Sequence, residues 1–168
     1  PAVTDARDAL EDDAPKLFGE SNVCVRAPRG DVNGVRTALA GATRIVRTSL
    51  HNHRVYGCPL EPRAALAEFD PGEERFTLYA PSQGVHRYKR SLAAALAVPA
   101  DCVRVLTGDV GGGFGLRIPC ANEYPLMLWA ARRCAQPVKW VSSRSESFLA
   151  DFHGRDVYCD AALAIGDE

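Results

Sequence analysis

A glycine run, Gly111–Gly115 (GGGFG), limits what this chain can fold into more than any other feature. An apolar, β-type segment precedes the run at 102–106, and a helical pattern follows it at 122–134. Glycine has no Cβ, so the backbone can adopt positive φ angles and bring its N–H groups close to a ligand. Backbone amides of this kind favour anionic oxygens. We therefore expect a strand–loop–helix unit whose loop approaches phosphate or an oxo group, and a flexible connector is the alternative.

Known nucleotide-binding loops do not account for the run. The pattern G-x-x-x-x-G-K-[ST] is absent because neither Lys nor Ser/Thr follows Gly115. The dinucleotide pattern G-x-G-x-x-G fails as well, since Leu116 stands where its third glycine belongs. A Phe between glycines also argues against a mere connector, because its side chain has to point at something.

The periodicity along the rest of the chain predicts an α+β fold with mixed sheets and βαβ-like units. Residues 1–30 have little periodicity and are expected to be a connector, with residues 31–168 forming part of a domain. Because the last strand runs into a Gly-Asp turn with no partner after it, we expect that domain to continue beyond residue 168. Helices are predicted at 31–40, 84–97, 122–134 and 143–150. Strands are predicted at 44–50, within 55–69 (either one strand or two), and at 75–80, 102–106, 137–141 and 156–165.

Several buried positions follow from the same patterns. In the helix at 84–97, Tyr88 and Leu92 are expected to face the core. In the helix at 122–134, the spacing of Leu126, Trp129 and Ala130 predicts burial. Asp31 is expected to cap the first helix and Gly41 to end it. Both tryptophans, Trp129 and Trp140, are expected to be core aromatics.

Composition excludes some functions. The chain has 168 residues with 20 Lys+Arg against 21 Asp+Glu, so no basic surplus exists to bind nucleic acid. No apolar run approaches the ~20 residues that span a bilayer. Six cysteines form no C-x-x-C pair and no zinc-type cluster. Three of them fall in apolar segments, which favours small buried thiols and a cytoplasmic location.

Five sequence blocks, in order, resemble the large subunits of the molybdenum hydroxylases, the superfamily of xanthine dehydrogenase, aldehyde oxidase and carbon monoxide dehydrogenase. Together they are far more specific than any single block, and the likeness covers most of this chain but a minor part of such a subunit. The blocks are LEPRAA at 60–65, APSQG at 80–84, VPADCVRV at 98–105, DVGGGFG at 109–115 and PVKWVSSRSE at 137–146.

The resemblance implies a molybdenum–pterin cofactor, molybdopterin or its cytosine dinucleotide form, and a hydroxylation that takes oxygen from water. Iron–sulfur clusters and FAD are then expected on other domains or subunits. By motif position, Gln83 lies near the oxo group on molybdenum, where a primary amide can donate a hydrogen bond without carrying charge. Phe114 borders the metal, and Gly112 and Gly113 bring backbone close to the cofactor. None of these residues is expected to ligate the metal directly.

Three departures from the family pattern matter. Ile118 stands where purine-oxidising members have a Glu, which argues against a xanthine-like substrate and leaves aldehydes, N-heterocycles or CO. Arg117 replaces the usual Lys. The family's catalytic Glu is absent from these residues, so the catalytic residues are unknown and the chain alone is expected to be inactive. The block around Glu61 is expected to form a structural ion pair or fix a turn.

Two alternatives stay open at this stage. The chain could be a non-catalytic assembly fragment that pairs with the rest of its subunit through apolar surface. It could also be an unrelated α+β domain whose glycine loop holds phosphate. In the leading interpretation its partners are the remainder of the large subunit and iron–sulfur and flavin subunits, with no nucleic acid and no membrane.

Overall fold

The computed structural model describes residues 3–166 and divides into two compact units. One unit is the continuous segment Tyr56–Gly154, and the other is built from the chain before and after it. Each is described by itself. The stretch 44–52 pairs with the final strand at 157–165, which joins the chain before residue 56 and the chain after residue 154 into one unit.

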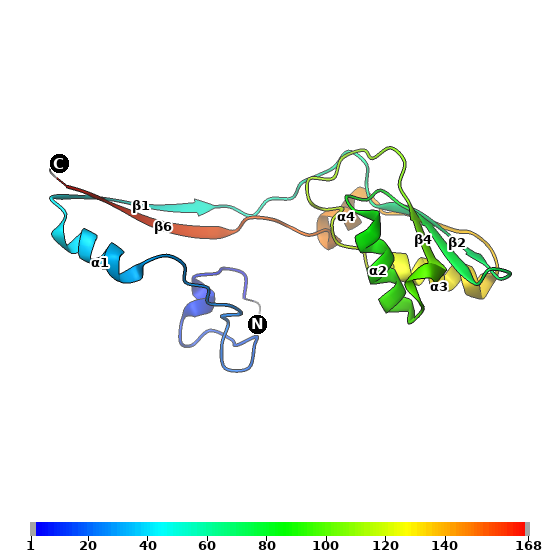
Figure 1. Cartoon of the computed structure of the whole chain (residues 1–168), viewed down its shortest axis with the longest axis horizontal. Coiled ribbons are helices and arrows are strands. Elements are labelled where there is room, and N and C mark those ends of the chain that lie inside the picture. Colours follow the sequence, from blue (N-terminus) through cyan, green and yellow to red (C-terminus); the bar gives the residue numbers. More distant parts are fainter. Residues whose placement is uncertain (1–2, 167–168) are drawn as a thin grey trace. The chain divides into compact units, whose positions relative to one another are not determined.

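The unit Tyr56–Gly154 is built on a four-stranded mixed sheet of order β4-β3-β2-β5 (Figure 1). The neighbours β3 and β4 are parallel, and β2 is antiparallel to both β3 and β5. The pair β3–β4 is joined by helix α2, which is the βαβ unit that the sequence predicts. The strands are β2 (Ala64–Asp70), β3 (Arg75–Tyr79), β4 (Val103–Leu106) and β5 (Val138–Val141).

Two helices, α2 (Val85–Leu96) and α3 (Glu123–Cys134), pack on this sheet and on each other. Alternate strand residues face them, so that Ala67 and Leu78 are completely buried. Tyr88 and Leu92 of α2 fill the space between, as predicted. The unit is completed by the short helices η2 (Ala100–Cys102) and α4 (Arg144–Ala150), the latter opened by a capping box between Ser143 and Glu146.

The prediction for the buried face of α3 is wrong. Leu126 is 65% exposed and Trp129 57% exposed, whereas the buried residues are Tyr124, Met127, Leu128 and Ala131. Both sets repeat at helical spacing. The second set is the buried one, because α3 packs on the sheet and on α2, where the Tyr124 ring contacts the Tyr88 ring. The other tryptophan, Trp140, packs partly buried against the core.

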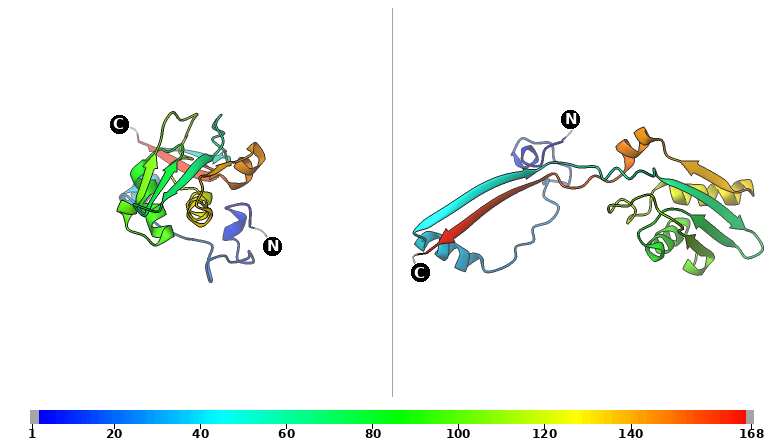
Figure 2. Two further views of the ribbon diagram at one scale, coloured as in Figure 1. Left: turned by 90° about the vertical axis from the view of Figure 1, so that its right-hand side faces the viewer. Right: turned by 90° about the horizontal axis from the view of Figure 1, so that it is seen from above.

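The second unit contains a long two-stranded antiparallel ribbon of β1 (Arg44–Asn52) and β6 (Val157–Ile165), which run side by side in Figure 1 and in the right-hand view of Figure 2. Helix α1 (Val32–Gly41) precedes it, and a 3-10 turn, η1 (Asp8–Leu10), lies near the start of the chain. Asp31 caps α1 by accepting from the Gly34 N–H, as predicted. Gly41 lies in the last turn of the helix instead of beyond it.

The segment 55–69 forms one strand, β2, which is the first of the two alternatives, because Pro59 and Pro62 keep the segment before Ala64 in a loop. All six cysteines are free thiols, but Cys134 and Cys159 are exposed, since each lies on the solvent side of its element.

No helix within residues 3–166 combines the length and the apolar character needed to cross a bilayer.

Candidate functional site

Gln83 and the glycine loop lie at the same edge of the sheet because they follow the carboxyl ends of β3 and β4, which are parallel neighbours. Pairing continues past the strands, where the Ala80 N–H donates to the Leu106 carbonyl at 3.1 Å. Beyond that point the Gln83 N–H donates to the Arg117 carbonyl at 3.0 Å. The two segments singled out in the sequence are therefore in direct contact.

The side chain of Gln83 is oriented by the loop. Its Oε1 accepts hydrogen bonds from the backbone N–H of Gly115 (2.9 Å) and of Arg117 (3.3 Å). Because both partners are donors, the atom facing them has to be the carbonyl oxygen, and the NH₂ group points away from the loop. Within the described part of the chain, Nε2 has no hydrogen-bond partner. An amide donor is thus held in a fixed orientation with both hydrogens free.

Two of the glycines are required by close packing. A Cβ on Gly113 would lie 2.5 Å from Oε1 of Gln83, and a Cβ on Gly112 would lie 3.1 Å from the Phe114 ring. Gly112 also has φ +106°, a value that other residues rarely adopt. In the described structure, no hydrogen bond uses the N–H groups of Gly112, Gly113 and Phe114. The loop therefore presents three successive free donors beside the free amide of Gln83.

Phe114 does not fold back into the core. Its side chain is 74% exposed, and its backbone has φ +50°, an outlier for a bulky residue. Strained backbone of this kind persists where the surroundings enforce it and is concentrated at functional sites. This exposure leaves the ring available to border a ligand.

Arg117, at the end of the loop, is 1% exposed, which the sequence did not reveal. One terminal nitrogen donates to the Glu61 carbonyl at 2.7 Å, while Nε and the other terminal nitrogen have no hydrogen-bond partner. The positive charge of Arg117 acts to lower the pKa of the buried Tyr88 and Tyr124 phenols, against the effect of burial. Burial raises the pKa of Tyr88 to about 12 despite the opposing effect of Arg117. A buried positive charge with free donors thus lies behind the loop.

Glu61 is bound to the loop, and Arg63 forms the ion pairs expected of this block. The Glu61 carboxylate accepts from the Gly111 N–H at 2.8 Å, and the Glu61 N–H donates to the Gly111 carbonyl at 3.1 Å. The buried Arg63 pairs with Asp151 at 2.6 Å and with Glu123 at 2.8 Å. Sequence reasoning missed this network because its members are distant in the chain, and the only signal was the position of Arg63 in a matched block.

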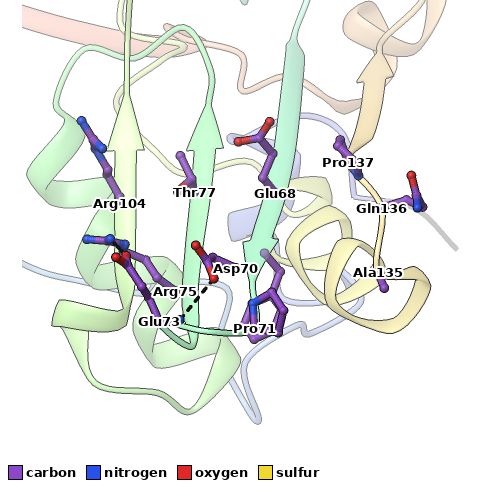
Figure 3. Close-up of a pocket in the computed structure, with 11 residues that line it drawn as sticks. Glu68, Asp70, Pro71, Glu73, Arg75, Thr77, Arg104, Ala135, Gln136 and Pro137 are labelled. Atoms are coloured by element: carbon purple, nitrogen blue, oxygen red, sulfur yellow. Dashed lines mark hydrogen bonds and ion pairs between the residues drawn. The ribbon is translucent and has the colours of Figure 1, made fainter.

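Cavities border the sheet at both ends of its strands. One, of about 470 Å³, lies at the edge opposite the glycine loop, between the β2–β3 turn and the start of β5, and Figure 3 shows its charged side chains Glu68, Arg75 and Arg104. Another, of about 510 Å³, adjoins the loop and is lined by Glu61, Tyr79, Asp109, Lys139 and eight neighbours. Within residues 3–166, no three or more His, Cys, Asp or Glu side chains are grouped to hold a metal ion.

Residues 17–168 match the family model of the molybdopterin cofactor-binding domain. The chain belongs to this family. It is 31% identical to the carbon monoxide dehydrogenase large chain of Hydrogenophaga pseudoflava, over 98% of this chain and 22% of that one. It is 32% identical to the nicotine 6-hydroxylase large subunit of Paenarthrobacter nicotinovorans, over 99% of this chain and 20% of the relative.

The fold agrees. The quinoline 2-oxidoreductase of Pseudomonas putida 86 superposes with a TM-score of 0.87 at 29% identity, over 99% of this chain and 21% of that chain. The molybdenum hydroxylase resemblance and its pterin cofactor are confirmed. The chain spans about a fifth of the length of these relatives.

Proposed function

We propose that Gln83 and the loop residues Gly112, Gly113 and Phe114 form part of the binding site for the molybdenum–pterin cofactor. The observation that carries the proposal is the group of free donors: three consecutive backbone N–H groups beside a fixed side-chain amide. Oxygen-rich, anionic groups are the ligands that such a surface accepts. The missing Cβ atoms of the glycines allow the approach, so the residues present fit the group.

In this proposal each residue has a positional role. The backbone N–H groups of Gly112 and Gly113 hold oxygens of the cofactor, and Nε2 of Gln83 donates to an oxo group beside the metal without adding charge. Phe114 borders the metal and excludes water from one side. When bound, the cofactor supplies the oxygen and electron-transfer chemistry, and the protein supplies orientation and electrostatics.

We propose further that the chain belongs to a large subunit that oxidises an aldehyde, an N-heterocycle or CO and is inactive alone. The relatives' names support this range of substrates, and the small share of them that is spanned supports missing parts. Its partners would be the rest of that subunit and subunits carrying iron–sulfur clusters and FAD. Free cysteines are consistent with a cytoplasmic location. We keep residues 1–30 as a proposed connector to the domain at 31–168.

The sharpest test is Gln83→Glu. The new carboxylate keeps an oxygen for the N–H groups of Gly115 and Arg117, but it replaces the free NH₂ donor by a negatively charged acceptor. We expect binding of the purified cofactor, followed by pterin fluorescence and molybdenum content after dialysis, to weaken at least tenfold. Gln136→Glu makes the same charge change on an exposed residue at the opposite edge and should leave binding unchanged.

Equal binding by the two variants would refute the assignment of Gln83. Inactivity of the chain is tested separately, by supplying the cofactor-loaded chain with an aldehyde and an electron-accepting dye. Stoichiometric molybdenum together with turnover by this chain unaided would overturn the proposal that it needs the rest of a subunit.

Exposed apolar side chains favour assembly as a second function. Leu126 and Trp129, three positions apart on α3, are 65% and 57% exposed, and neighbouring apolar side chains on a surface usually face a partner. Gel filtration with and without a complementary large-subunit segment tests this. A stable compact monomer that ignores the segment would contradict it.

A further inference from the structure

The loop 111–117 contains the glycine run, and both of its ends contact one residue, Glu61. At the first end, Gly111 exchanges two hydrogen bonds with Glu61, one to the carboxylate at 2.8 Å and one from the Glu61 N–H at 3.1 Å. At the other end, the buried guanidinium of Arg117 donates to the Glu61 carbonyl at 2.7 Å. The backbone and the side chain of Glu61 therefore both take part in closing the loop.

Glu61 is itself held in place from one side by Arg144. This side chain donates to the Pro59 carbonyl at 2.8 Å and to the Leu60 carbonyl at 2.7 Å. On the other side, Arg63 anchors the segment through its buried pair with Asp151. Charge-assisted hydrogen bonds of this kind are stronger than neutral ones. Glu61 thus rests on a segment that is fixed before and after it.

The contact between Glu61 and Gly111 leaves no room for a side chain. A Cβ on Gly111 would lie 2.5 Å from the Glu61 Cβ and 3.4 Å from its backbone nitrogen. Glu61 therefore leaves room only for glycine at position 111, and Gln83 does the same at position 113. Since one oxygen of the Glu61 carboxylate is engaged by a backbone N–H, its role is to position the loop.

We propose that Glu61 is a positioning residue that sets the separation of the two ends of the loop 111–117. That separation fixes the direction of the N–H groups of Gly112, Gly113 and Phe114. The effect of this positioning on cofactor binding rests on the proposed function. The contacts of Glu61 with both ends of the loop do not depend on it. Losing the Glu61 carboxylate should loosen the first end directly, because it removes the acceptor of the Gly111 N–H. The second end should loosen indirectly, because a Glu61 backbone that is no longer held through its carboxylate shifts the carbonyl that accepts from Arg117.

Amide hydrogen exchange of the cofactor-free chain, measured for each residue by NMR, tests whether Glu61 holds the two ends of the loop 111–117. In Glu61→Ala, protection at Gly111 should fall roughly tenfold or more, the size expected for a lost charge-assisted hydrogen bond. Protection should also fall at Gly115 and Arg117, whose N–H groups bond to Gln83 and not to Glu61. A purely local contact would change Gly111 alone. Glu68→Ala, on strand β2, is the matched control and should leave the loop unchanged.

Glu61→Gln covers the case in which the alanine variant does not fold. It keeps an oxygen acceptor but loses the charge, so Gly111 should exchange several-fold faster while the strands keep their protection. Unchanged exchange at Gly111 in this variant, or unchanged exchange at Gly115 and Arg117 in Glu61→Ala, would overturn the proposal. Because no cofactor is present, these results stand apart from the Gln83→Glu binding test, and either proposal can fail alone.

Discussion

Replacing Gly113 by Ala should break the contact between the loop and Gln83. The added Cβ would lie 2.5 Å from Oε1, 2.6 Å from Cδ and 2.9 Å from Cγ of that side chain, so Gln83 must move. Moving it breaks the hydrogen bonds from the N–H groups of Gly115 and Arg117. At about 0.5–1.5 kcal/mol each, the expected loss in the free energy of unfolding is about 1–3 kcal/mol.

A double-mutant cycle isolates this cause, with the free energy of unfolding measured by urea denaturation. Once Gln83→Ala has removed the colliding atoms and both hydrogen bonds, Gly113→Ala should cost less than about 0.5 kcal/mol. The coupling energy should therefore be at least about 0.5 kcal/mol. Gly108→Ala is the control, because nothing lies within 4 Å of its added Cβ. Additive effects of the two substitutions would refute the contact as the reason for Gly113.

Three other predictions follow from burial. Burial raises the pKa of the Cys120 thiol to about 11, so at pH 8 iodoacetamide should label it far more slowly than the exposed Cys134, and equal rates on the folded chain would contradict this. Burial favours the neutral phenol of Tyr88 in the folded state and raises its pKa to about 12. Its contribution to stability should be complete below pH 10 and lost as the pH rises through 12, a loss on the order of 3 kcal/mol at most. Tyr88→Phe should abolish that part of the alkaline loss in urea denaturation measured as a function of pH. Asp151→Ala leaves the buried Arg63 with one carboxylate partner and should cost about 3 kcal/mol in urea denaturation, and a loss below about 1 kcal/mol would contradict the importance of the pair.

The order of helices and strands could be predicted from the sequence because hydrophobic periodicity is a local property. The βαβ unit around α2 and the cap at Asp31 depend on neighbouring residues and were confirmed. The convergence of Gln83 with the glycine loop could also be foreseen, since both follow strands and parallel neighbours end at one edge.

The buried face of α3 could not be predicted in this way. Leu126 and Trp129 satisfy helical periodicity as well as Tyr124 and Leu128 do, and only the sheet decides which pair loses its contact with water. The same holds for the thiol of Cys134, which lies in an apolar segment but on the outer side of its helix.

By itself, the sequence determined the element order, the family and the pairing of a bare loop with an amide, because each depends on residues close together or on matched motifs. Tertiary structure alone decided that Arg117 is buried, that Arg63 has two carboxylate partners and that Glu61 closes the loop. These contacts join residues tens of positions apart, and their energies depend on burial, which no local pattern specifies.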